Sequence, residues 1–295
     1  MSVPSRSFLL RHRLISFLRN MDVRGIRRLS VALPKLLLPS PEKTGKHILK
    51  TIHGFRLLID PSVDNGVELA LFTNGTYEEG TVDQLKKILK PGDTFLDVGA
   101  NIGWMSLIAS KAVGANGKVI AIEANPNTLP ILQHNLALNE AKNVEVLGIA
   151  VSDQQGEALL YENWNVNRGG ASLLSQDGEN GISVKVETLD RLFSPETPLH
   201  VVKIDVEGLE PQVIVGGKEW FTQQQPVFVF EISTERNSEK GAAAMDVIEL
   251  IRTLGHYHFY RHPATKERKG TLIEISDFTQ LPAHDNLFAI PLKRK

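Results

Sequence analysis

The stretch of sequence that decides the fold is Phe95-Leu96-Asp97-Val98-Gly99-Ala100-Asn101-Ile102-Gly103. It predicts a buried strand over 94–98, then a turn punctuated by glycines, then a helix over 103–113. A second strand is expected over 118–122, and it ends at an acid, Glu123. This order of strand, turn, helix, strand and acid is typical of an α/β sheet that binds a nucleotide-type ligand across the carboxyl ends of its parallel strands.

The turn also indicates which ligand is bound. A dinucleotide-binding turn carries G-x-G-x-x-G, so that a pyrophosphate reaches the helix N-terminus, whereas here the spacing is Gly99-x-x-x-Gly103. Both glycines let the backbone turn sharply and approach a ligand closely. Asp97 disfavours a pyrophosphate but suits an ammonium group, and Glu123 can accept both hydroxyl hydrogens of a ribose. S-adenosylmethionine has an ammonium, a ribose and no phosphate, so these residues favour it as the cofactor.

Four other classes of protein agree less well with these residues. A plain α/β domain without a ligand would not require Asp97 and Glu123 at this separation. An NAD-type oxidoreductase is disfavoured by the missing G-x-G-x-x-G and by Asp97. A non-catalytic module that keeps the cofactor fold is disfavoured by the set Asp97, Glu123 and Asp205, although only turnover excludes it. A nucleic-acid methyltransferase would need a basic groove, and beyond the N-terminus the charges are mixed.

Short motifs along more than half of the chain follow one another in a familiar order and spacing. They are Tyr77-Glu78, Lys90-Pro91-Gly92-Asp93, Asp97-Val98-Gly99-Ala100-Asn101-Ile102-Gly103, Glu123-Ala124-Asn125-Pro126, Ala150-Val151-Ser152-Asp153, Val202-Lys203-Ile204-Asp205-Val206-Glu207-Gly208 and Phe230-Glu231. On these motifs the stretch from Gly75 to Ser233 resembles the FkbM-type family of S-adenosylmethionine-dependent methyltransferases. The run from Lys203 to Gly208 is the most family-specific. The resemblance implies a seven-stranded methyltransferase sheet and methylation of a hydroxyl, often on a sugar or a natural product.

The predicted fold class is therefore α/β, a class I (Rossmann-like) methyltransferase. We expect a seven-stranded, mostly parallel sheet with helices on both faces, plus an N-terminal helical and hairpin extension. Strands are expected at 94–98, 118–122, 144–149, 200–204, 227–230, 257–260 and 287–291, with a hairpin at 47–53 and 55–60. The expected domains are residues 1–75, a basic helical segment and hairpin, and residues 76–295, the methyltransferase domain.

The candidate catalytic residues follow the fourth and fifth core strands. Lys203, Asp205 and Glu207 alternate, so they share one side while the strand geometry lasts, and Glu231 ends the neighbouring strand. Clustered carboxylates in a cleft have perturbed pKa values. One of Asp205, Glu207 and Glu231 is expected to act as the general base that removes the proton of an acceptor hydroxyl.

Each of these residues also has a structural interpretation. Glu207 would stabilise the N-terminus of the following helix, Asp205 would contact the methionine end of the cofactor, and Lys203 would neutralise a carboxylate. An acid cluster also suits a divalent cation. Without a clear ligand set, we expect no metal.

Cofactor contacts are expected from several segments besides the turn. The full predicted set is Glu78, Asp97, Gly99, Ala100, Asn101, Gly103, Glu123, Ala124, Ala150, Ser152, Asp153 and Asp205. The segment 150–153 follows the third strand, where class I enzymes meet the adenine ring, and Glu78 is placed to reach the amino acid end. The loop over 163–181, with Arg168 and Ser172, is either a lid over the substrate or a plain connection.

Composition limits what else the protein does. With 295 residues, 42% of them hydrophobic and 23% charged, the chain can bury one large α/β core with appendages. A net charge of −1 gives no overall attraction to nucleic acid, and the absence of cysteine excludes disulfides and thiolate chemistry. No apolar run reaches the roughly 18 residues of a membrane-spanning helix. We expect a cytoplasmic enzyme that acts on a small hydroxylated acceptor and has no nucleic-acid partner.

The N-terminal fifty residues are strongly basic. Their acidic residues are Asp22 and Glu42, and their basic residues are Arg6, Arg11, Arg13, Arg19, Arg24, Arg27, Arg28, Lys35, Lys43, Lys46 and Lys50. An apolar helical face of Leu10, Leu14, Phe17 and Leu18 is expected, and the basic residues 11–13 argue against a signal peptide. The favoured interpretation is a helix packed on its own domain, so that the protein does not sediment with anionic vesicles. The alternatives are a weak peripheral membrane contact and a subunit contact in a homo-oligomer.

Overall fold

The computed structural model describes residues 6–21, 38, 40, 44–161, 181–233, 244–282 and 284–292. Its helices are α1 (Arg6–Asn20), α3 (Val67–Asn74), α4 (Glu79–Ile88), α5 (Trp104–Val113), α6 (Leu129–Leu138), α7 (Leu189–Leu192), α8 (Glu210–Gly216), α9 (Lys218–Gln224), α10 (Ala244–Leu254) and the 3-10 turn η3 (Phe278–Gln280). Its strands are β1 (His47–Lys50), β2 (Arg56–Ile59), β3 (Thr94–Val98), β4 (Lys118–Ile122), β5 (Val144–Leu147), β6 (Ala150–Val151), β7 (Gly156–Leu160), β8 (Ile182–Glu187), β9 (Val201–Ile204), β10 (Val227–Ser233), β11 (Tyr257–Arg261), β12 (Ile273–Glu274) and β13 (His284–Pro291).

The central sheet has eight strands in the order β12-β11-β13-β10-β9-β3-β4-β5. The five strands from β10 to β5 are parallel, and β13, β11 and β12 are antiparallel to their neighbours. The expected mostly parallel α/β sheet is confirmed. The observed sheet has one strand more than the seven expected. The additional strand is β12, a two-residue edge strand in which Glu274 pairs with Tyr260 and Ile273 with Arg261.

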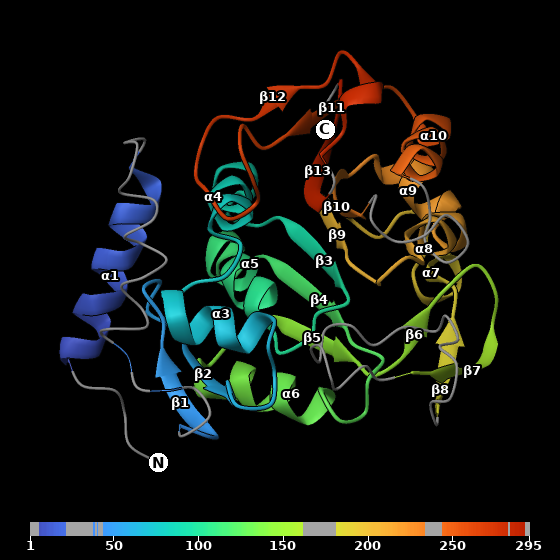
Figure 1. The fold of residues 1–295 in the computed structure, drawn as a ribbon. Helices are drawn as coiled ribbons and strands as arrows, with labels where there is room; N and C mark the ends of the chain where they lie inside the picture. Colours follow the sequence, from blue (N-terminus) through green and yellow to red (C-terminus); the bar gives the residue numbers. More distant parts are fainter. Residues whose placement is uncertain are drawn as a thin grey trace.

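Side chains of the central strands alternate between two hydrophobic cores. Phe95 and Val201 contribute to the core under α3 to α6, whereas Leu96 and Val202 contribute to the core under α7 to α10. Figure 1 shows these two groups of helices on opposite faces of the sheet. Because the strands are buried on both faces, they are apolar almost throughout. A charged side chain at their ends therefore needs a specific partner.

The turn between β3 and α5 is shaped by two glycines with different roles. Gly99 has φ 83°, and a Cβ there would lie 1.9 Å from the carbonyl oxygen of Asp205, so only glycine lets β3 and β9 end this close together. Gly103 has φ 87°, and its Cβ would lie 2.7 Å from Cδ1 of Leu132. The lack of a side chain at Gly103 therefore lets the start of α5 pack closely against α6.

The N-terminal hairpin and α3 share a core with the sheet. The hairpin expected at 47–60 is confirmed as β1 and β2. Buried Asn135 of α6 accepts from the backbone N–H of Leu58 (2.7 Å) and donates to the carbonyl oxygen of Ile102 (2.9 Å), so it ties β2 to the turn after β3. Leu57 and Phe72 lie in the same hydrophobic cluster as Phe95. The core thus continues across the boundary expected at residue 75.

Helix α1 packs on the domain, but not through the expected face. His12 Nε2 donates to the carbonyl oxygen of Phe72 (2.7 Å), and the Ser16 hydroxyl donates to Oε1 of Glu79 (2.8 Å). Ile15, which lies between these two residues in the sequence, is buried. The carbonyl of Phe72 belongs to the last turn of α3, where helix carbonyls lack partners within the helix. Hydrogen bonds to α3 and α4 therefore orient α1, and they turn the expected apolar face outward. None of the helices in the described ranges is both long and apolar enough to cross a bilayer. Residues 22–37 of the expected basic helical segment lie outside those ranges.

Candidate active site

A cavity of about 260 Å³ lies at the carboxyl ends of β3, β4 and β9. Most of the predicted site residues line it: Asp97, Gly99, Ala100, Asn101, Glu123, Ala124, Ala150, Asp205, Glu207 and Glu231. Ligands of open α/β sheets bind at this edge, because the strands end there and the loops open. Pockets of this order of size hold small-molecule ligands and cofactors.

Asp97, the last residue but one of β3, has a buried carboxylate with one oxygen in a hydrogen bond. Its Oδ2 accepts from the hydroxyl of Ser106 (2.5 Å), while its buried Oδ1 has no hydrogen-bond partner among the described residues. Burial raises the pKa of Asp97, and the ammonium of Lys203 opposes that shift. A buried acceptor without a donor costs about 1–3 kcal/mol. The amino group of S-adenosylmethionine is a donor of the required charge, so Asp97 fits that end of the cofactor.

Glu123, directly after β4, is oriented by two backbone amides. Its Oε2 accepts from the N–H of Asn101 (2.7 Å), and its Oε1 accepts from the N–H of Asn125 (2.8 Å). Burial raises the pKa of Glu123 to about 7 against the effect of these hydrogen bonds. Each carboxylate oxygen retains a second acceptor position. Glu123 therefore fits the two hydroxyls of a ribose.

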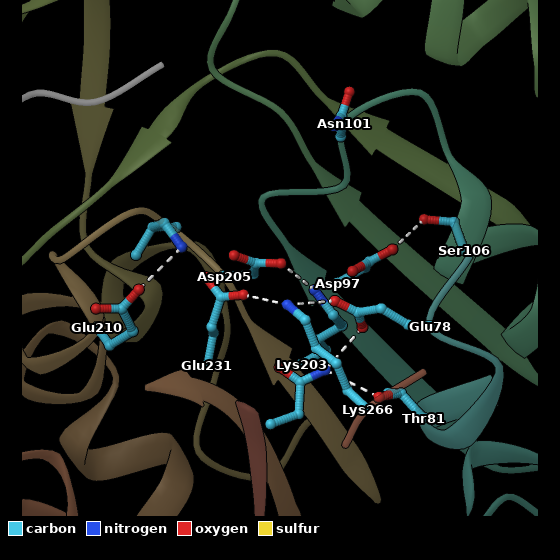
Figure 2. Close-up of polar contacts among 12 residues, drawn as sticks. Glu78, Thr81, Asp97, Asn101, Ser106, Lys203, Asp205, Glu210, Glu231 and Lys266 are labelled. Carbon is cyan, nitrogen blue, oxygen red and sulfur yellow. Dashed lines mark hydrogen bonds and ion pairs between the residues drawn. The ribbon is translucent and has the colours of Figure 1, made fainter. Parts of the chain in front are cut away.

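A network of carboxylates and lysines lies at the cavity, beside Asp97 (Figure 2). Lys203 of β9 donates to Oδ2 of Asp205 at 2.6 Å. Lys266 contacts Oε1 of Glu78 at 2.8 Å and also forms an ion pair with Glu231. The carbonyl oxygen of Lys266 accepts from the N–H of Gly80 (2.8 Å), so the start of α4 positions this lysine.

Both lysines stay charged although they are buried. Burial alone would lower the pKa of Lys203, but Asp205 and Glu78 outweigh it and raise that pKa. Burial would likewise lower the pKa of Lys266, but Glu78, Tyr77, Glu231 and Asp205 together outweigh it and raise that pKa. Each ammonium therefore remains as a fixed positive charge beside the cavity.

The carboxylates of the network differ in whether their pKa is lowered or raised. Burial would raise the pKa of Asp205, but Lys203 and then Lys266 hold it below its ordinary value. Glu78 behaves likewise, because Lys266 and Lys203 offset its burial. Burial and then the charge of Asp205 raise the pKa of Glu231 to about 8, and Lys266 opposes this shift. Glu231 thus takes up or releases a proton near neutral pH, whereas Asp205 stays ionised.

The balance of charge around the cavity suits a cationic ligand. Four carboxylates (Glu78, Asp97, Asp205 and Glu231) surround two ammonium groups (Lys203 and Lys266). S-adenosylmethionine carries a sulfonium and an ammonium, whereas NAD carries a pyrophosphate. Glu78 and Asp205 offset the two ammonium groups, so ionisation of Asp97 or Glu231 leaves a surplus of negative charge that favours the former ligand.

The same carboxylates have the spacing of a cation site. One oxygen each of Glu78, Asp205 and Glu231 lies within 4.8 Å of the others. Lys266 already contacts two of these three residues, so its ammonium supplies positive charge where a divalent ion would otherwise supply it.

Three residues of this network were not expected from the sequence. Lys266 follows β11, and His284 and Asn286 begin β13. His284 Nε2 lies 3.3 Å from Oε1 of Glu231, and Asn286 Nδ2 donates to Oε2 of Glu78 at 2.7 Å. β13 runs antiparallel to β10, so its first residues lie at the carboxyl edge of the parallel strands. The polar run His284-Asp285-Asn286 ahead of an apolar strand was the available signal.

Four predicted cofactor contacts do not line the cavity: Glu78, Gly103, Ser152 and Asp153. Glu78 is buried behind it as the partner of Lys266. Ser152 follows β6, which leaves the central sheet and pairs with β8, so residues 152 and 153 lie beside α8. Arg168 and Ser172 lie outside the described residues.

The fold and the cavity define an α/β protein of the class I methyltransferase type, built to hold S-adenosylmethionine at the strand ends. The family model for the methyltransferase FkbM domain matches residues 97–261, more than half of the chain. The chain therefore belongs to this family. The resemblance to this family is confirmed, as are, for the matched domain, its class, a methyltransferase, and S-adenosylmethionine as the methyl donor.

Similar proteins include solved structures and curated relatives. The FkbM methyltransferase of Methylobacillus flagellatus KT is 17% identical, with 95% of this chain and 58% of that chain covered and a TM-score of 0.45. Aeropyrum pernix fibrillarin in complex with natively bound S-adenosyl-L-methionine is 12% identical, with 84% and 83% covered and a TM-score of 0.44. An arsenite methyltransferase of Halobacterium salinarum is 37% identical over 57 residues, 19% of this chain and 15% of that protein. The chain thus spans 58% of the length of the FkbM methyltransferase structure and 15% of the length of the arsenite methyltransferase.

Replacing Glu123 with alanine should weaken the binding of S-adenosylhomocysteine by at least about tenfold. The carboxylate would no longer accept the ribose hydroxyls, and hydrogen bonds to a charged group contribute about 1.5–3 kcal/mol each. Isothermal titration calorimetry on the purified variant measures the effect, with circular dichroism as the check on folding.

Glu123→Gln is the matched control, because an amide keeps the shape of the side chain and one acceptor oxygen. In the wild type, affinity should also fall as the pH drops below about 7, where Glu123 becomes protonated, and this dependence should be absent from the glutamine variant. Equal affinities of the wild type and the alanine variant would refute the ribose assignment.

Proposed function

We propose that this protein methylates a hydroxyl of a small polar acceptor, such as a sugar, a polysaccharide precursor or a natural product. When bound, S-adenosylmethionine supplies an electrophilic methyl group. An alcohol is a weak nucleophile until its proton is removed, so a base within reach of the hydroxyl is the main requirement on the protein. The cytoplasmic location expected from the sequence belongs to this proposal.

The observation that carries the proposal is Glu231 at the cavity wall, with a pKa of about 8 and His284 beside it. A carboxylate with a pKa near the working pH is a stronger base than an ordinary one and is still ionised in part. Glu231 accepts the hydroxyl proton, and its contact with His284 gives that proton a route towards the half-exposed imidazole.

The other residues of the network position the reactants. Asp97 holds the amino group of the cofactor and Glu123 holds its ribose. Lys203 fixes Asp205 in its ionised form next to the cavity. Orienting two reactants in this way contributes as much to a displacement as proton removal does.

The polar wall of the cavity supports a polar acceptor. Glu207 has φ 57° in the turn after β9, which places it at the cavity together with Glu231 and His284. Carboxylate and imidazole groups recognise hydroxyls by accepting and donating hydrogen bonds. An apolar acceptor could neither donate a hydrogen bond to these groups nor accept one from them.

Product analysis with a labelled methyl donor tests the proposal. The purified protein is incubated with [methyl-13C]-S-adenosylmethionine and a panel of sugars, nucleotide sugars and hydroxylated natural products. Mass spectrometry finds the methylated product, and its 13C–1H correlation spectrum identifies the methylated atom. The expected product carries the label on oxygen. A label on nitrogen or carbon, or exclusive labelling of nucleic acid, would contradict the proposal.

A further inference from the structure

The outer side of α1 carries a line of exposed apolar side chains. Leu10, Leu14 and Phe17 are 64%, 47% and 64% exposed, and their spacing of four and three residues places them on one side of the helix. The opposite side is fixed to the domain by His12 and Ser16. Single exposed apolar residues are ordinary on protein surfaces, but an aligned set on an anchored helix indicates an interaction surface.

A basic groove lies directly beside this apolar line. The groove, of about 480 Å³, runs between α1 and α4, and Phe17 belongs to both the line and the groove. Its cationic side chains are Arg13, Lys86 and Lys269, and Lys111 lies near enough to act on the same groups. Figure 1 shows α1 at the outer edge of the molecule, away from α7 to α10.

The groups facing the groove leave an excess of positive charge. Lys86 donates to Nδ1 of His53 (2.8 Å), and burial together with the nearby lysines lowers the pKa of His53 to about 3, so this histidine is neutral. The acids are Glu79, which contacts Lys269 at 3.0 Å, and Asp83, which contacts Lys87 at 2.6 Å. Burial and then Lys269 lower the pKa of Lys86, which shows that these cations are crowded. An anion beside Lys86 would relieve this repulsion.

In place of the expectation from the sequence that α1 only packs on its own domain, we propose that α1 and this groove bind the surface of an anionic phospholipid bilayer. Leu10, Leu14 and Phe17 enter the boundary between headgroups and acyl chains, and a lipid phosphate lies in the groove between Arg13 and Lys86. This arrangement is that of an interfacial amphipathic helix, with apolar residues on one face and basic residues beside them. The surrounding sequence supports the choice, because the first fifty residues contain eleven arginines and lysines and two acids.

Charge also distinguishes a bilayer from a second copy of the chain. A symmetric dimer through this face would place the same surface patch of two subunits together, including Arg11 and Arg13, which flank the apolar line. Like charges brought together across an interface oppose association. An anionic bilayer meets the same arginines with opposite charge.

Sedimentation of the full-length protein with vesicles tests this proposal. With phosphatidylcholine vesicles that contain phosphatidylglycerol, we expect at least about tenfold more bound protein than with phosphatidylcholine alone, and release as salt is added. Replacing Leu10, Leu14 and Phe17 together with serine should lower binding to the anionic vesicles by at least about tenfold. Arg13→Glu should weaken binding and reduce its salt dependence.

The matched control is Val215→Ser on α8, an exposed apolar residue (44%) far from α1 in the sequence. It should sediment as the wild type does. Unchanged S-adenosylhomocysteine binding by all variants shows that they are folded. Equal sedimentation with neutral vesicles, or wild-type sedimentation of the triple variant, would overturn the proposal. So would a concentration-dependent dimer that the triple variant abolishes, or binding of glycerol phosphate without binding of vesicles.

Discussion

Replacing Lys266 with methionine should lower the free energy of unfolding by about 3–5 kcal/mol at neutral pH, because breaking a buried ion pair leaves uncompensated charge. The ammonium of Lys266 lies between Glu78, which is fully buried, and Glu231. Methionine keeps most of the volume of the side chain and removes only its charge. Urea unfolding followed by circular dichroism measures the loss.

The loss should depend on pH in a defined direction. Without the ammonium, the pKa of Glu78 in the folded protein rises above its unfolded value, near 4.5, and the pKa of Glu231, which is already raised, rises further. The folded state then binds more protons than the unfolded state above that pH, so the deficit grows as the pH rises. Below about pH 4.5 both carboxyls are protonated in both states, and the deficit should be small.

The matched control is Lys118→Met. Lys118 and Glu145 form an ion pair of 2.7 Å, but their side chains are 52% and 49% exposed, so its loss should cost less than about 1 kcal/mol. The double variant Lys266→Met with Glu78→Gln should recover part of the loss, because the fully buried carboxylate that lost its partner is then absent. Equal stability of the Lys266 and Lys118 variants at every pH would show that Lys266 does not neutralise the network.

The parallel part of the sheet was predictable from the sequence because its signals are local. The bounds of β3 and β4 agree with the expected strands at 94–98 and 118–122, where apolar residues lie between Gly, Pro and Asp positions. The two-residue strands β6 and β12 were not expected. Their residues carry no strand pattern of their own, and they pair only because β8 and β11 offer an open edge.

The site was predictable where it follows from the order of parallel strands. Asp97, Glu123 and Asp205 come directly at or after strand ends, so one rule places all three at the cavity. Lys266 and His284 depend on the register of the antiparallel strands, which no local pattern reveals. Ser152 and Asp153 were assigned by extending the third strand, whereas the chain leaves the central sheet at β6.

Helix α1 shows why an apolar face alone does not give the orientation of a helix. Leu10, Leu14 and Phe17 suggested the packed side, but the partners of His12 and Ser16 lie on α3 and α4. Hydrogen bonds to a helix-terminal carbonyl and to a buried carboxylate decided the orientation, and both partners are more than fifty residues away in the sequence.

Glu231→Gln should lower the rate of methyl transfer by about 10²–10⁴-fold, the usual range for the loss of a general base. The amide keeps the size of the side chain and an acceptor for Lys266, so S-adenosylhomocysteine should bind nearly as it does to the wild type. Asp205→Asn should lower the rate of methyl transfer less, because Lys203 and Lys266 already hold the pKa of Asp205 low and make it a weak base. Single-turnover methyl transfer with saturating cofactor measures these effects for the wild type, Glu231→Gln, Asp205→Asn and Glu207→Gln.

The pH profile separates a base from a residue that only positions others. The wild-type rate should fall as the pH drops below about 8, where Glu231 becomes protonated, and this dependence should vanish in Glu231→Gln. The pair His258 and Glu274 supplies the matched control, since Nδ1 and Oε1 lie 2.6 Å apart on an exposed edge of the sheet. Glu274→Gln should leave both rate and profile unchanged. Glu231→Gln could instead keep the wild-type rate while Asp205→Asn or Glu207→Gln loses it. The base is then the residue whose amide variant also loses the fall of the rate at low pH. If all three amide variants keep both, no carboxylate of this cluster removes the proton, and orientation of the reactants alone accounts for the rate.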